Sequence, residues 1–406
     1  MVNVIGLGYI GLPTALIMAE SGIKVVGTDK NNKLIHDLKE KKLRFDEDGL
    51  GELFHGAVRN GIEFSKEYQK ADIYIVAVPT PYIKQSKKVD TTYIMDAVRH
   101  ILEVCEQGAV IVIESTVSPG TISKSVRGLI EQQGCVCGED IHLVHAPERI
   151  IPGNMIAELR SNNRTIGAED IAVGKRIKDL YKSFCEGEIF LTDIKTAEMT
   201  KVVENTYRDI NIAFANELAK ICREGDMDVY EIIRIANMHP RVNILSPGPG
   251  VGGHCISVDP WFLVGDYPGL ANIILAARKI NDSMPEFVLK RISEIMDAEG
   301  VQDISRVGLY GITYKENVDD IRESPTLQLI DCMKKHLASG IKTYDPFVDR
   351  DVTENQYHEL NAFLNDIDLV VIMVGHDEII ENMEKIKDKI VLDTRNVSSV
   401  AGKYRL

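Results

Sequence analysis

Short apolar runs alternate with helical patterns along roughly the first half of the chain. This alternation predicts a mainly parallel sheet with helices on both faces, because buried parallel strands appear as near-continuous apolar stretches. The expected strands are Val2–Ile5, Lys24–Thr28, Ile73–Val78, Val110–Ile113 and Leu143–His145, and Thr165–Gly167 and Glu188–Leu191 are candidates to extend the same sheet. Helical patterns lie between the strands at Tyr9–Glu20 and Thr92–Cys105.

The pattern changes at Ile194. From Ile194 to Glu224 the chain contains neither Gly nor Pro, which predicts one helix roughly 46 Å long at 1.5 Å per residue. A second helix is expected over Asp228–Asn237, and the Gly- and Pro-rich stretch His239–Pro260 is expected to be a structured loop. The middle of the chain is therefore predicted to be helical.

Strand and helix patterns alternate again from Arg306. The expected strands are Val307–Gly311, Ile341–Tyr344, Leu369–Val374 and Ile390–Leu392, and a helix is expected over Thr326–Ala338. The sequence thus predicts an α/β fold with two Rossmann-like doubly wound domains, joined by a long central helix and a helical middle domain. The predicted divisions are 1–193, 194–300 and 301–406.

Composition and charge exclude several classes of protein. The 406 residues carry 47 Lys and Arg against 61 Asp and Glu, a net charge of −14, which is a poor balance for binding nucleic acid or an anionic membrane. No apolar run approaches the ~18 residues of a membrane helix, and a strand at the N-terminus leaves no room for a signal peptide. Seven cysteines, an odd number, do not suggest a disulfide framework. We expect a reduced, cytoplasmic protein without a metal site.

A glycine-rich turn follows the first predicted strand. Gly6, Gly8 and Gly11 form a G-x-G-x-x-G pattern that opens the first helical stretch, and Asp29 ends the second strand. Such glycines permit a tight turn and the close approach of a pyrophosphate, which the helix N-terminus then binds. A carboxylate at the end of the second strand accepts hydrogen bonds from ribose hydroxyls and repels a 2′-phosphate, so NAD is favoured over NADP. The alternative is a tight turn that binds no ligand.

Polar residues share one face of the long predicted helix. They recur at offsets of three and four, at Glu198, Lys201, Asn205 and Arg208. Such a set is usually a solvated polar stripe. The functional alternative is that Lys201 and Asn205 stabilise the alkoxide of a substrate hydroxyl that loses its proton and a hydride.

A cysteine lies in the Gly- and Pro-rich loop. Cys255 directly follows a glycine-rich stretch, which is expected to bring the backbone close to a ligand, with His254 beside it and Asp259 four residues further on. This setting predicts a thiol placed for covalent catalysis, although an average cysteine is more often a small buried hydrophobic residue.

These motifs together resemble the nucleotide-sugar 6-dehydrogenases, the family of UDP-glucose dehydrogenase. The resemblance runs from Gly6 to about Arg395. Beyond the glycines and Asp29 it includes Val78-Pro79-Thr80-Pro81, Glu114-Ser115-Thr116-Val117, Ala146-Pro147-Glu148, Ala197-Glu198, Lys201, Asn205, Gly252-Gly253-His254-Cys255, Asp259-Pro260, Gly311, Lys315, Asp320, Arg322 and Ser324-Pro325. It implies NAD in the first domain, the UDP-sugar against the third, and a homodimer or higher homo-oligomer formed through the long helix.

The resemblance also implies residue roles. The catalytic set is Cys255 as nucleophile, Lys201 and Asn205 at the reacting oxygen, Asp259 and Glu148 for hydrolysis, and Thr116. The cofactor contacts are Gly6, Gly8, Tyr9, Ile10, Gly11, Asp29, Thr80, Thr116 and Arg322. The substrate contacts are Arg149, Ile150, Lys201, Asn205, Arg208, His239, Arg241, Gly252 and Lys315, with Arg241 reaching the neighbouring protomer's site.

One departure from the family's sequence pattern narrows the choice of sugar. UDP-glucose members usually carry a second glutamate four residues after the one that matches Glu148, where this chain has Pro152. With Arg149, Arg208 and His239, this departure resembles the UDP-N-acetylmannosamine dehydrogenase branch. The implied reaction is the NAD-dependent four-electron oxidation of the 6-hydroxyl of UDP-N-acetyl-D-mannosamine to UDP-N-acetyl-D-mannosaminuronate, through a thiohemiacetal and a thioester, for polysaccharide biosynthesis.

Alternatives remain open at this point. UDP-GlcNAc, UDP-GalNAc or UDP-glucose can replace the proposed sugar, because pocket shape decides the epimer. A two-electron β-hydroxyacid-type dehydrogenase would have no need of Cys255 or of a second α/β domain. An inactive NAD-binding sensor gives no reason for Lys201, Asn205 and Cys255 to occur together.

Overall fold

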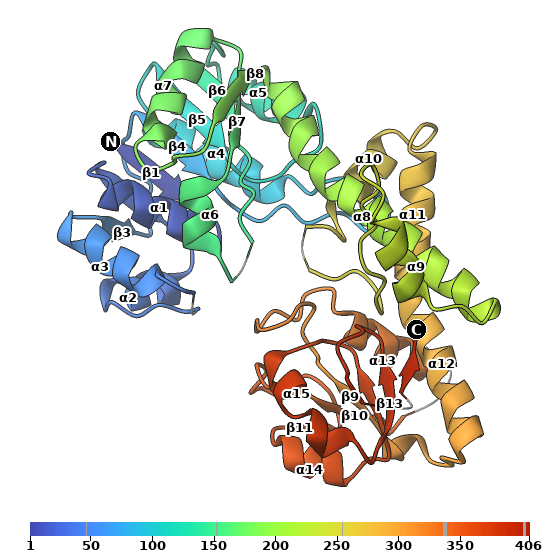
Figure 1. The fold of residues 1–406 in the computed structure, drawn as a ribbon. Helices are drawn as coiled ribbons and strands as arrows, with labels where there is room; N and C mark the ends of the chain where they lie inside the picture. Colours follow the sequence, from blue (N-terminus) through green and yellow to red (C-terminus); the bar gives the residue numbers. More distant parts are fainter. Residues whose placement is uncertain (46, 152, 254, 336–338, 401–402) are drawn as a thin grey trace. The chain divides into compact units, whose positions relative to one another are not determined.

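The computed structural model describes residues 1–45, 47–151, 153–253, 255–335, 339–400 and 403–406. Pro152 and His254, and the end of the predicted helix Thr326–Ala338, lie outside the described residues. The chain divides into two compact units, Met1–Glu204 and Asn205–Leu406, each with its own sheet (Figure 1).

The first unit is built on an eight-stranded sheet in the order β3-β2-β1-β4-β5-β6-β7-β8. Neighbouring strands are parallel except for β6 and β7, which are antiparallel. The strands are β1 (Val2–Ile5), β2 (Val25–Thr28), β3 (Glu63–Ser65), β4 (Ile73–Val76), β5 (Ala109–Ile113), β6 (Ile141–His145), β7 (Arg164–Ala168) and β8 (Ile189–Thr192). The first six strands have the order of a dinucleotide-binding sheet.

Side chains of the central strands alternate between two apolar cores. On β4, Ile73 and Ile75 pack on one face of the sheet, and Tyr74 and Val76 pack on the other. The first face is covered by α1 (Gly11–Glu20), α2 (Asn32–Lys39), α3 (Leu50–Arg59), α6 (Met155–Ser161) and α7 (Ile171–Lys182). The second face is covered by α4 (Thr92–Val104), η1 (Ile122–Val126) and α5 (Arg127–Gln132). Burial on both faces explains the near-continuous apolar sequence of these strands.

The predicted long helix is confirmed as α8, whose 31 residues run from Ile194 to Glu224 and pass from the first unit into the second (Figure 1). The next helix, α9 (Val229–Ala236), begins after Asp228, whose carboxylate accepts the N–H groups of Tyr230 and Glu231. The remaining helices of this region are α10 (Asp259–Asp266), α11 (Asn272–Asp282) and α12 (Met284–Glu299).

The second sheet has six parallel strands in the order β11-β10-β9-β12-β13-β14. The strands are β9 (Val307–Tyr310), β10 (Lys342–Tyr344), β11 (Gln356–Tyr357), β12 (Leu369–Ile372), β13 (Ile390–Asp393) and β14 (Tyr404–Arg405). The helices around it are η2 (Ile304–Arg306), α13 (Pro325–Lys335), α14 (Leu360–Asn365), α15 (Asp377–Glu381) and η3 (Met383–Ile386). Counted from β9, the order repeats that of β1 to β6, so the predicted fold class with two doubly wound sheets is confirmed.

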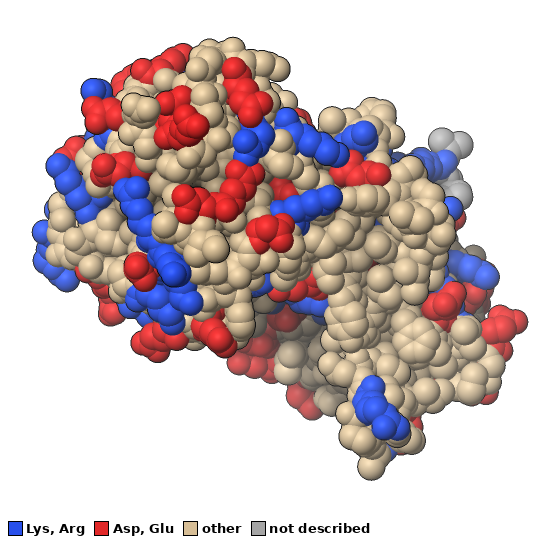
Figure 2. Space-filling model, turned by 90° about the horizontal axis from the view of Figure 1, so that it is seen from above, with Lys and Arg blue, Asp and Glu red and all other residues tan. Residues whose placement is uncertain are grey.

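Within the described ranges, every helix is too short or too polar to cross a membrane. In the same ranges no three His, Cys, Asp or Glu side chains gather as a metal site. On the face drawn in Figure 2, Lys and Arg are interspersed with Asp and Glu. This face therefore offers an anionic ligand a few local cations rather than a broad basic field.

Candidate active site

The turn after β1 fits a dinucleotide. Gly6 has a φ of +88°, and a Cβ there would lie 2.8 Å from the carbonyl oxygen of Ala77. A Cβ on Gly11 would lie 1.9 Å from the carbonyl oxygen of Gly6, so the protein's own packing requires both glycines. A Cβ on Gly8 would meet no heavy atom within 4 Å. Packing gives no reason for glycine at this position, whereas the close approach of a pyrophosphate does.

Asp29 holds this turn from the end of β2. Its Oδ2 accepts the N–H of Leu7 at 2.8 Å, and its Oδ1 accepts the N–H of Asn31 at 2.8 Å. The side chain stays half-buried. The first helical turn of α1 carries neither a side-chain cap nor an acidic residue, which suits phosphate at its positive end. The residues of this turn thus fit NAD.

Other predicted cofactor contacts lie at the same edge of the sheet. Thr80 and Thr116 are half-buried and follow the carboxyl ends of β4 and β5. Ser115 joins these two segments, because its hydroxyl donates to the carbonyl oxygen of Val78 at 2.6 Å. Tyr9 packs its ring on Phe45 with the centroids 4.5 Å apart. Of the predicted cofactor contacts, Arg322 belongs to the second unit.

Glu148 forms a buried ion pair with Arg164. One carboxylate oxygen accepts from Arg164 Nη1 at 2.6 Å, and both side chains are under 5% exposed. The other oxygen accepts the backbone N–H groups of Arg149 at 2.7 Å and of Ile150 at 3.2 Å. Glu148 therefore shapes the backbone of the predicted substrate contacts that follow it.

A second buried carboxyl, Glu114, lies close to this pair. Tyr181 donates its hydroxyl to Glu114 Oε1 at 2.9 Å. Burial, reinforced by the negative charge of Glu148, raises the pKa of Glu114 to about 8. Glu114 is therefore mostly protonated at neutral pH, whereas Glu148 is ion-paired. Neither Glu114 nor Arg164 was predicted as a site residue, although Glu114 begins the quoted Glu114-Ser115-Thr116-Val117 motif.

The Arg149 side chain forms hydrogen bonds with other residues of the first unit. Its Nε lies 2.8 Å from Glu204 Oε2, and its terminal nitrogens donate to the carbonyl oxygen of Asn163 at 2.9 Å and to Thr165 Oγ1 at 3.0 Å. It lines a cavity of about 610 Å³ together with Asn162, Asn163, Thr165, Phe190, Thr192, Thr196, Thr200 and Glu204.

The polar face of α8 is buried over three of its four predicted members. Glu198, Lys201 and Asn205 are 0%, 7% and 5% exposed, whereas Arg208 is exposed. Glu198 accepts the N–H groups of Gly120 and Ile122. The Lys201 side chain forms no hydrogen bond or ion pair with any residue that the structure describes. A solvated stripe is therefore the wrong interpretation for all but Arg208.

Asn205 connects α8 to the cysteine loop. Its Nδ2 donates to Asp259 Oδ2 at 2.6 Å, and Asp259 is 3% exposed. The carbonyl oxygen of Cys255 accepts the N–H groups of Val258 at 3.0 Å and of Asp259 at 2.9 Å. The half-buried cysteine thus lies in the turn that leads into α10.

The glycines before Cys255 contact the chain itself. A Cβ on Gly252 would lie 2.6 Å from Tyr314 Cβ, and a Cβ on Gly253 would lie 2.9 Å from the Tyr314 ring. Gly253 also donates its N–H to the carbonyl oxygen of Arg322 at 2.9 Å. Burial, with smaller effects of Asp320 and Cys255, raises the pKa of Tyr314 to about 12. The sequence suggested that these glycines lie close to a ligand. In the structure, the segment that contains Tyr314 lies close to them instead.

The remaining predicted contacts in the second unit differ in exposure. Arg322 forms a bidentate ion pair with Asp320 through Nε and Nη2. Lys315 is half-buried. The preceding residue, Tyr314, was not predicted as a site residue, and its position beside Lys315 was the available signal. His239 and Arg241 are exposed on their own chain, and the Arg241 N–H donates to His239 Nδ1 at 3.3 Å.

A doubly wound sheet with this glycine turn and an acid after its second strand defines an NAD-binding protein. Comparison with known families gives the specific assignment. The NAD binding, central and UDP binding domains of the UDP-glucose/GDP-mannose dehydrogenase family match residues 1–185, 195–283 and 308–399. The chain belongs to this family, so its cofactor is NAD and its substrate class is the nucleotide sugars.

Individual relatives cover nearly the whole chain. The UDP-N-acetyl-D-mannosamine dehydrogenase of Methanocaldococcus jannaschii is 44% identical over 97% of this chain and 92% of its own length. The solved UDP-N-acetyl-mannosamine dehydrogenase Cap5O of Staphylococcus aureus is 39% identical, with a TM-score of 0.89 over 100% of this chain and 97% of that one. The Pyrococcus horikoshii UDP-D-ManNAc dehydrogenase is 35% identical, with a TM-score of 0.91 over 100% and 98%.

Proposed function

We propose that the chain oxidises the 6-hydroxyl of UDP-N-acetyl-D-mannosamine to a carboxylate and uses two NAD. The observation that carries this proposal is the bond from Asn205 to Asp259 at 2.6 Å, because Asp259 begins the helix into which the Cys255 turn leads. This bond connects the Asn205 amide, which suits a reacting oxygen, to the Asp259 carboxylate and to the turn that contains the Cys255 thiol. We keep 1–193, 194–300 and 301–406 as the NAD-binding, central dimerisation and UDP-sugar-binding domains.

Lys201 and Asn205 act in the first oxidation. Lys201 is a buried cation without a partner among the described residues, which leaves its ammonium available to a substrate oxygen. The ammonium and the Asn205 amide stabilise the alkoxide that forms when the hydroxyl loses its proton. NAD, held by the glycine turn after β1 and by Asp29, would supply the hydride acceptor for both oxidations. The first oxidation gives the aldehyde.

Cys255 acts in the second oxidation. Its thiolate adds to the aldehyde carbon and forms a thiohemiacetal, whose loss of a second hydride gives a thioester. Water then cleaves the thioester, releasing the carboxylate and the free thiol. The covalent adduct retains the reactive aldehyde within the protein until the second step.

The two predicted hydrolytic carboxylates have different surroundings. Both oxygens of Glu148 already accept hydrogen bonds, from Arg164 and from two backbone N–H groups. We assign the hydrolytic water to Asp259, because Asp259 adjoins the Cys255 turn. Glu148 then supports the reaction by holding the backbone of Arg149 and Ile150.

The choice of sugar and the oligomeric state rest on other observations. The relatives of highest identity described above are named for UDP-N-acetylmannosamine. We assign the acetamido group to Arg149, Arg208 and His239. Along α8, Val203, Tyr207 and Phe214 are 46%, 62% and 49% exposed, which supports a homodimer through this helix. The exposed Arg241 then contributes to the neighbouring protomer's site.

The experiment that tests the proposal is NADH release from UDP-ManNAc, UDP-GlcNAc, UDP-GalNAc and UDP-glucose. We expect the highest kcat/KM with UDP-ManNAc and two NADH per sugar. Turnover of UDP-glucose alone would contradict the choice of sugar. One NADH per sugar would favour the two-electron dehydrogenase, and no NADH from any sugar would favour the NAD-binding sensor.

A further inference from the structure

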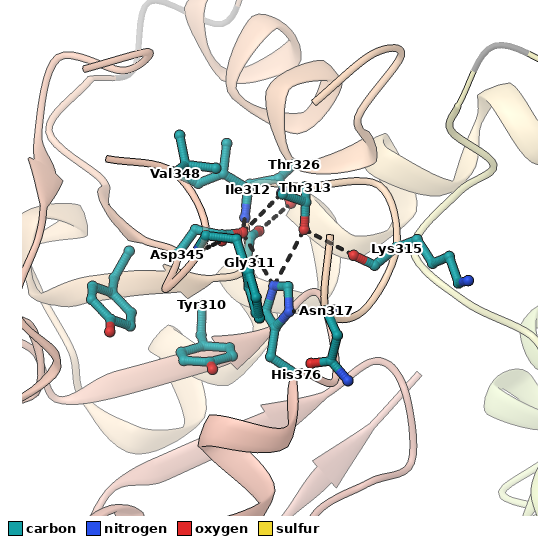
Figure 3. Close-up of polar contacts among 12 residues, drawn as sticks. Tyr310, Gly311, Ile312, Thr313, Lys315, Asn317, Thr326, Asp345, Val348 and His376 are labelled. Atoms are coloured by element: carbon teal, nitrogen blue, oxygen red, sulfur yellow. Dashed lines mark hydrogen bonds and ion pairs between the residues drawn. The ribbon is translucent and has the colours of Figure 1, made fainter. Parts of the chain in front are cut away.

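A buried polar cluster lies at the carboxyl ends of β9 and β10, outside the proposed catalytic set. Its central members are Thr313, Asp345 and His376, and all three side chains are fully buried (Figure 3). Buried polar groups of this kind are costly unless each one has a hydrogen-bond partner. Their partners therefore indicate what the cluster holds in place.

Asp345 binds the backbone that leaves β9. Its Oδ2 accepts the N–H groups of Ile312 at 2.6 Å and of Thr313 at 2.9 Å, and its Oδ1 accepts the N–H of Phe347 at 2.8 Å. Burial alone would raise the pKa of Asp345, but the bonds from His376 and from the backbone lower it below its usual value. Asp345 is therefore an ionised acceptor at neutral pH.

His376 connects Asp345 to Asn317, which lies further along the segment that leaves β9. The N–H of Asn317 donates to His376 Nδ1 at 2.9 Å, so this nitrogen carries no proton and Nε2 carries it. Nε2 lies 3.2 Å from Asp345 Oδ2 and 3.2 Å from Thr313 Oγ1. The Thr313 hydroxyl in turn donates to the carbonyl oxygen of Lys315 at 3.0 Å.

The cluster thus fixes the backbone from Ile312 to Asn317. Asn317 has a φ of +57°, a left-handed conformation that is held by its bonds to His376 and to the N–H of Asp377. In Figure 3 the carbonyl oxygen of Lys315 faces Thr313, while its side chain extends away from the cluster. The cluster therefore lies behind Lys315 and orients it.

We propose that Thr313, Asp345 and His376 are positioning residues that set the affinity for the nucleotide part of the substrate through Lys315. The inference rests on the proposed role of Lys315 as a substrate contact. A diphosphate is the anion that an ammonium on the family's UDP binding domain would meet. A fixed Lys315 backbone lowers the entropy lost when that ion pair forms.

The test is the dissociation constant of UDP for the full-length protein, because UDP does not depend on the identity of the sugar. Thr313→Val removes the hydroxyl at nearly constant shape, Thr313→Ser is the matched control that keeps it, and NAD binding reports on the first unit. We expect Thr313→Val to weaken UDP binding three- to tenfold and Thr313→Ser to bind UDP as the unchanged protein does, both with unchanged NAD affinity. His376→Asn keeps an acceptor for Asn317 but loses the donor to Thr313, and should show the same effect.

The same measurements in a Lys315→Ala background separate the possible failures. If the cluster acts through Lys315, Thr313→Val adds nothing to the loss caused by Lys315→Ala. An unchanged UDP affinity in Thr313→Val, or a loss that multiplies that of Lys315→Ala, overturns the positioning role and leaves the proposed function intact. An unchanged affinity in Lys315→Ala removes the substrate contact itself, and the positioning role with it.

Discussion

Each of the two doubly wound sheets uses an aspartate to stabilise the turn that follows its first strand. In each sheet the second strand ends in an aspartate, Asp29 after β2 and Asp345 after β10. In each, that carboxylate accepts backbone N–H groups from the turn that leaves the first strand, at Leu7 in one unit and at Ile312 and Thr313 in the other. The shared bond stabilises the tight departure of the chain from a central strand.

The two sheets differ in what surrounds that aspartate. Asp29 is half-buried beside a turn whose Gly8 position is open, and α1 begins at Gly11. Asp345 is fully buried under His376, and a long segment separates its turn from α13. The first arrangement presents backbone N–H groups and an acid to a dinucleotide. The second presents side chains on a long loop. Topology therefore fixes where a site lies, whereas the loop decides which ligand it takes.

The largest expected effect is on stability, at Asp345. Asp345→Asn replaces an acceptor by an amide whose NH2 group faces N–H donors, so we expect a loss of about 3 kcal/mol in the free energy of unfolding at pH 7. Because the folded protein lowers the pKa of Asp345, the stabilisation is present above about pH 4 and is lost as the pH falls through the lower folded value. Chemical denaturation at pH 7 and pH 3 measures both effects, and the exposed Asp349→Asn is the control. An equal loss at both pH values would contradict the lowered pKa of Asp345.

A smaller effect is expected at Gly8. Gly8→Ala places a methyl group where the protein has no atom within 4 Å, so the melting temperature should stay within about 1 °C. The methyl group instead meets the pyrophosphate, and we expect NAD affinity to fall about thirtyfold, or about 2 kcal/mol. Gly51→Ala, at an equally open position in α3, serves as control. Unchanged NAD binding in Gly8→Ala would refute the proposed cofactor turn.

The last effect, a gradual change with pH of on the order of 1 kcal/mol per pH unit, distinguishes the buried carboxyls of the two units. The pKa of Glu114 is raised to about 8, so the folded protein keeps a proton that the unfolded chain loses near pH 4.5. Stability therefore falls as the pH rises between these values, opposite to the trend for Asp345. Glu114→Gln should become more stable than the unchanged protein by on the order of 1 kcal/mol per pH unit between pH 5 and pH 8. Denaturation across this range, with the exposed Glu131→Gln as control, measures it. A pH-independent difference would contradict the raised pKa.

The fold was predictable because its strongest features are local. The long helix from Ile194 to Glu224 follows from the absence of Gly and Pro, and the central strands follow from burial on both faces. The short edge strands β3, β11 and β14 were missed, because each contains one aromatic residue beside polar residues and no apolar run. Their place beside longer strands is set by the sheet rather than by their own sequence.

The candidate site was predictable only where a motif marks it. The bond from Asn205 to Asp259 joins two predicted residues, but the pairing of Glu148 with Arg164 joins segments that no sequence period connects. The Asp345 and His376 pair was missed for the same reason. Its available signal was an aspartate directly after a predicted strand, as at Asp29. Glycines before Cys255 suggested a ligand, yet their close neighbour is Tyr314.

We propose that Cys255 carries the second oxidation while Lys201 and Asn205 serve the first. The most direct measurement is the number of NADH released per UDP-ManNAc by the unchanged protein and by Cys255→Ala, with an aldehyde trap present. We expect two NADH from the unchanged protein. From Cys255→Ala we expect no more than one, released slowly and with the aldehyde trapped, because the first hydride transfer needs no thiol. Two NADH per sugar from Cys255→Ala would contradict this proposal.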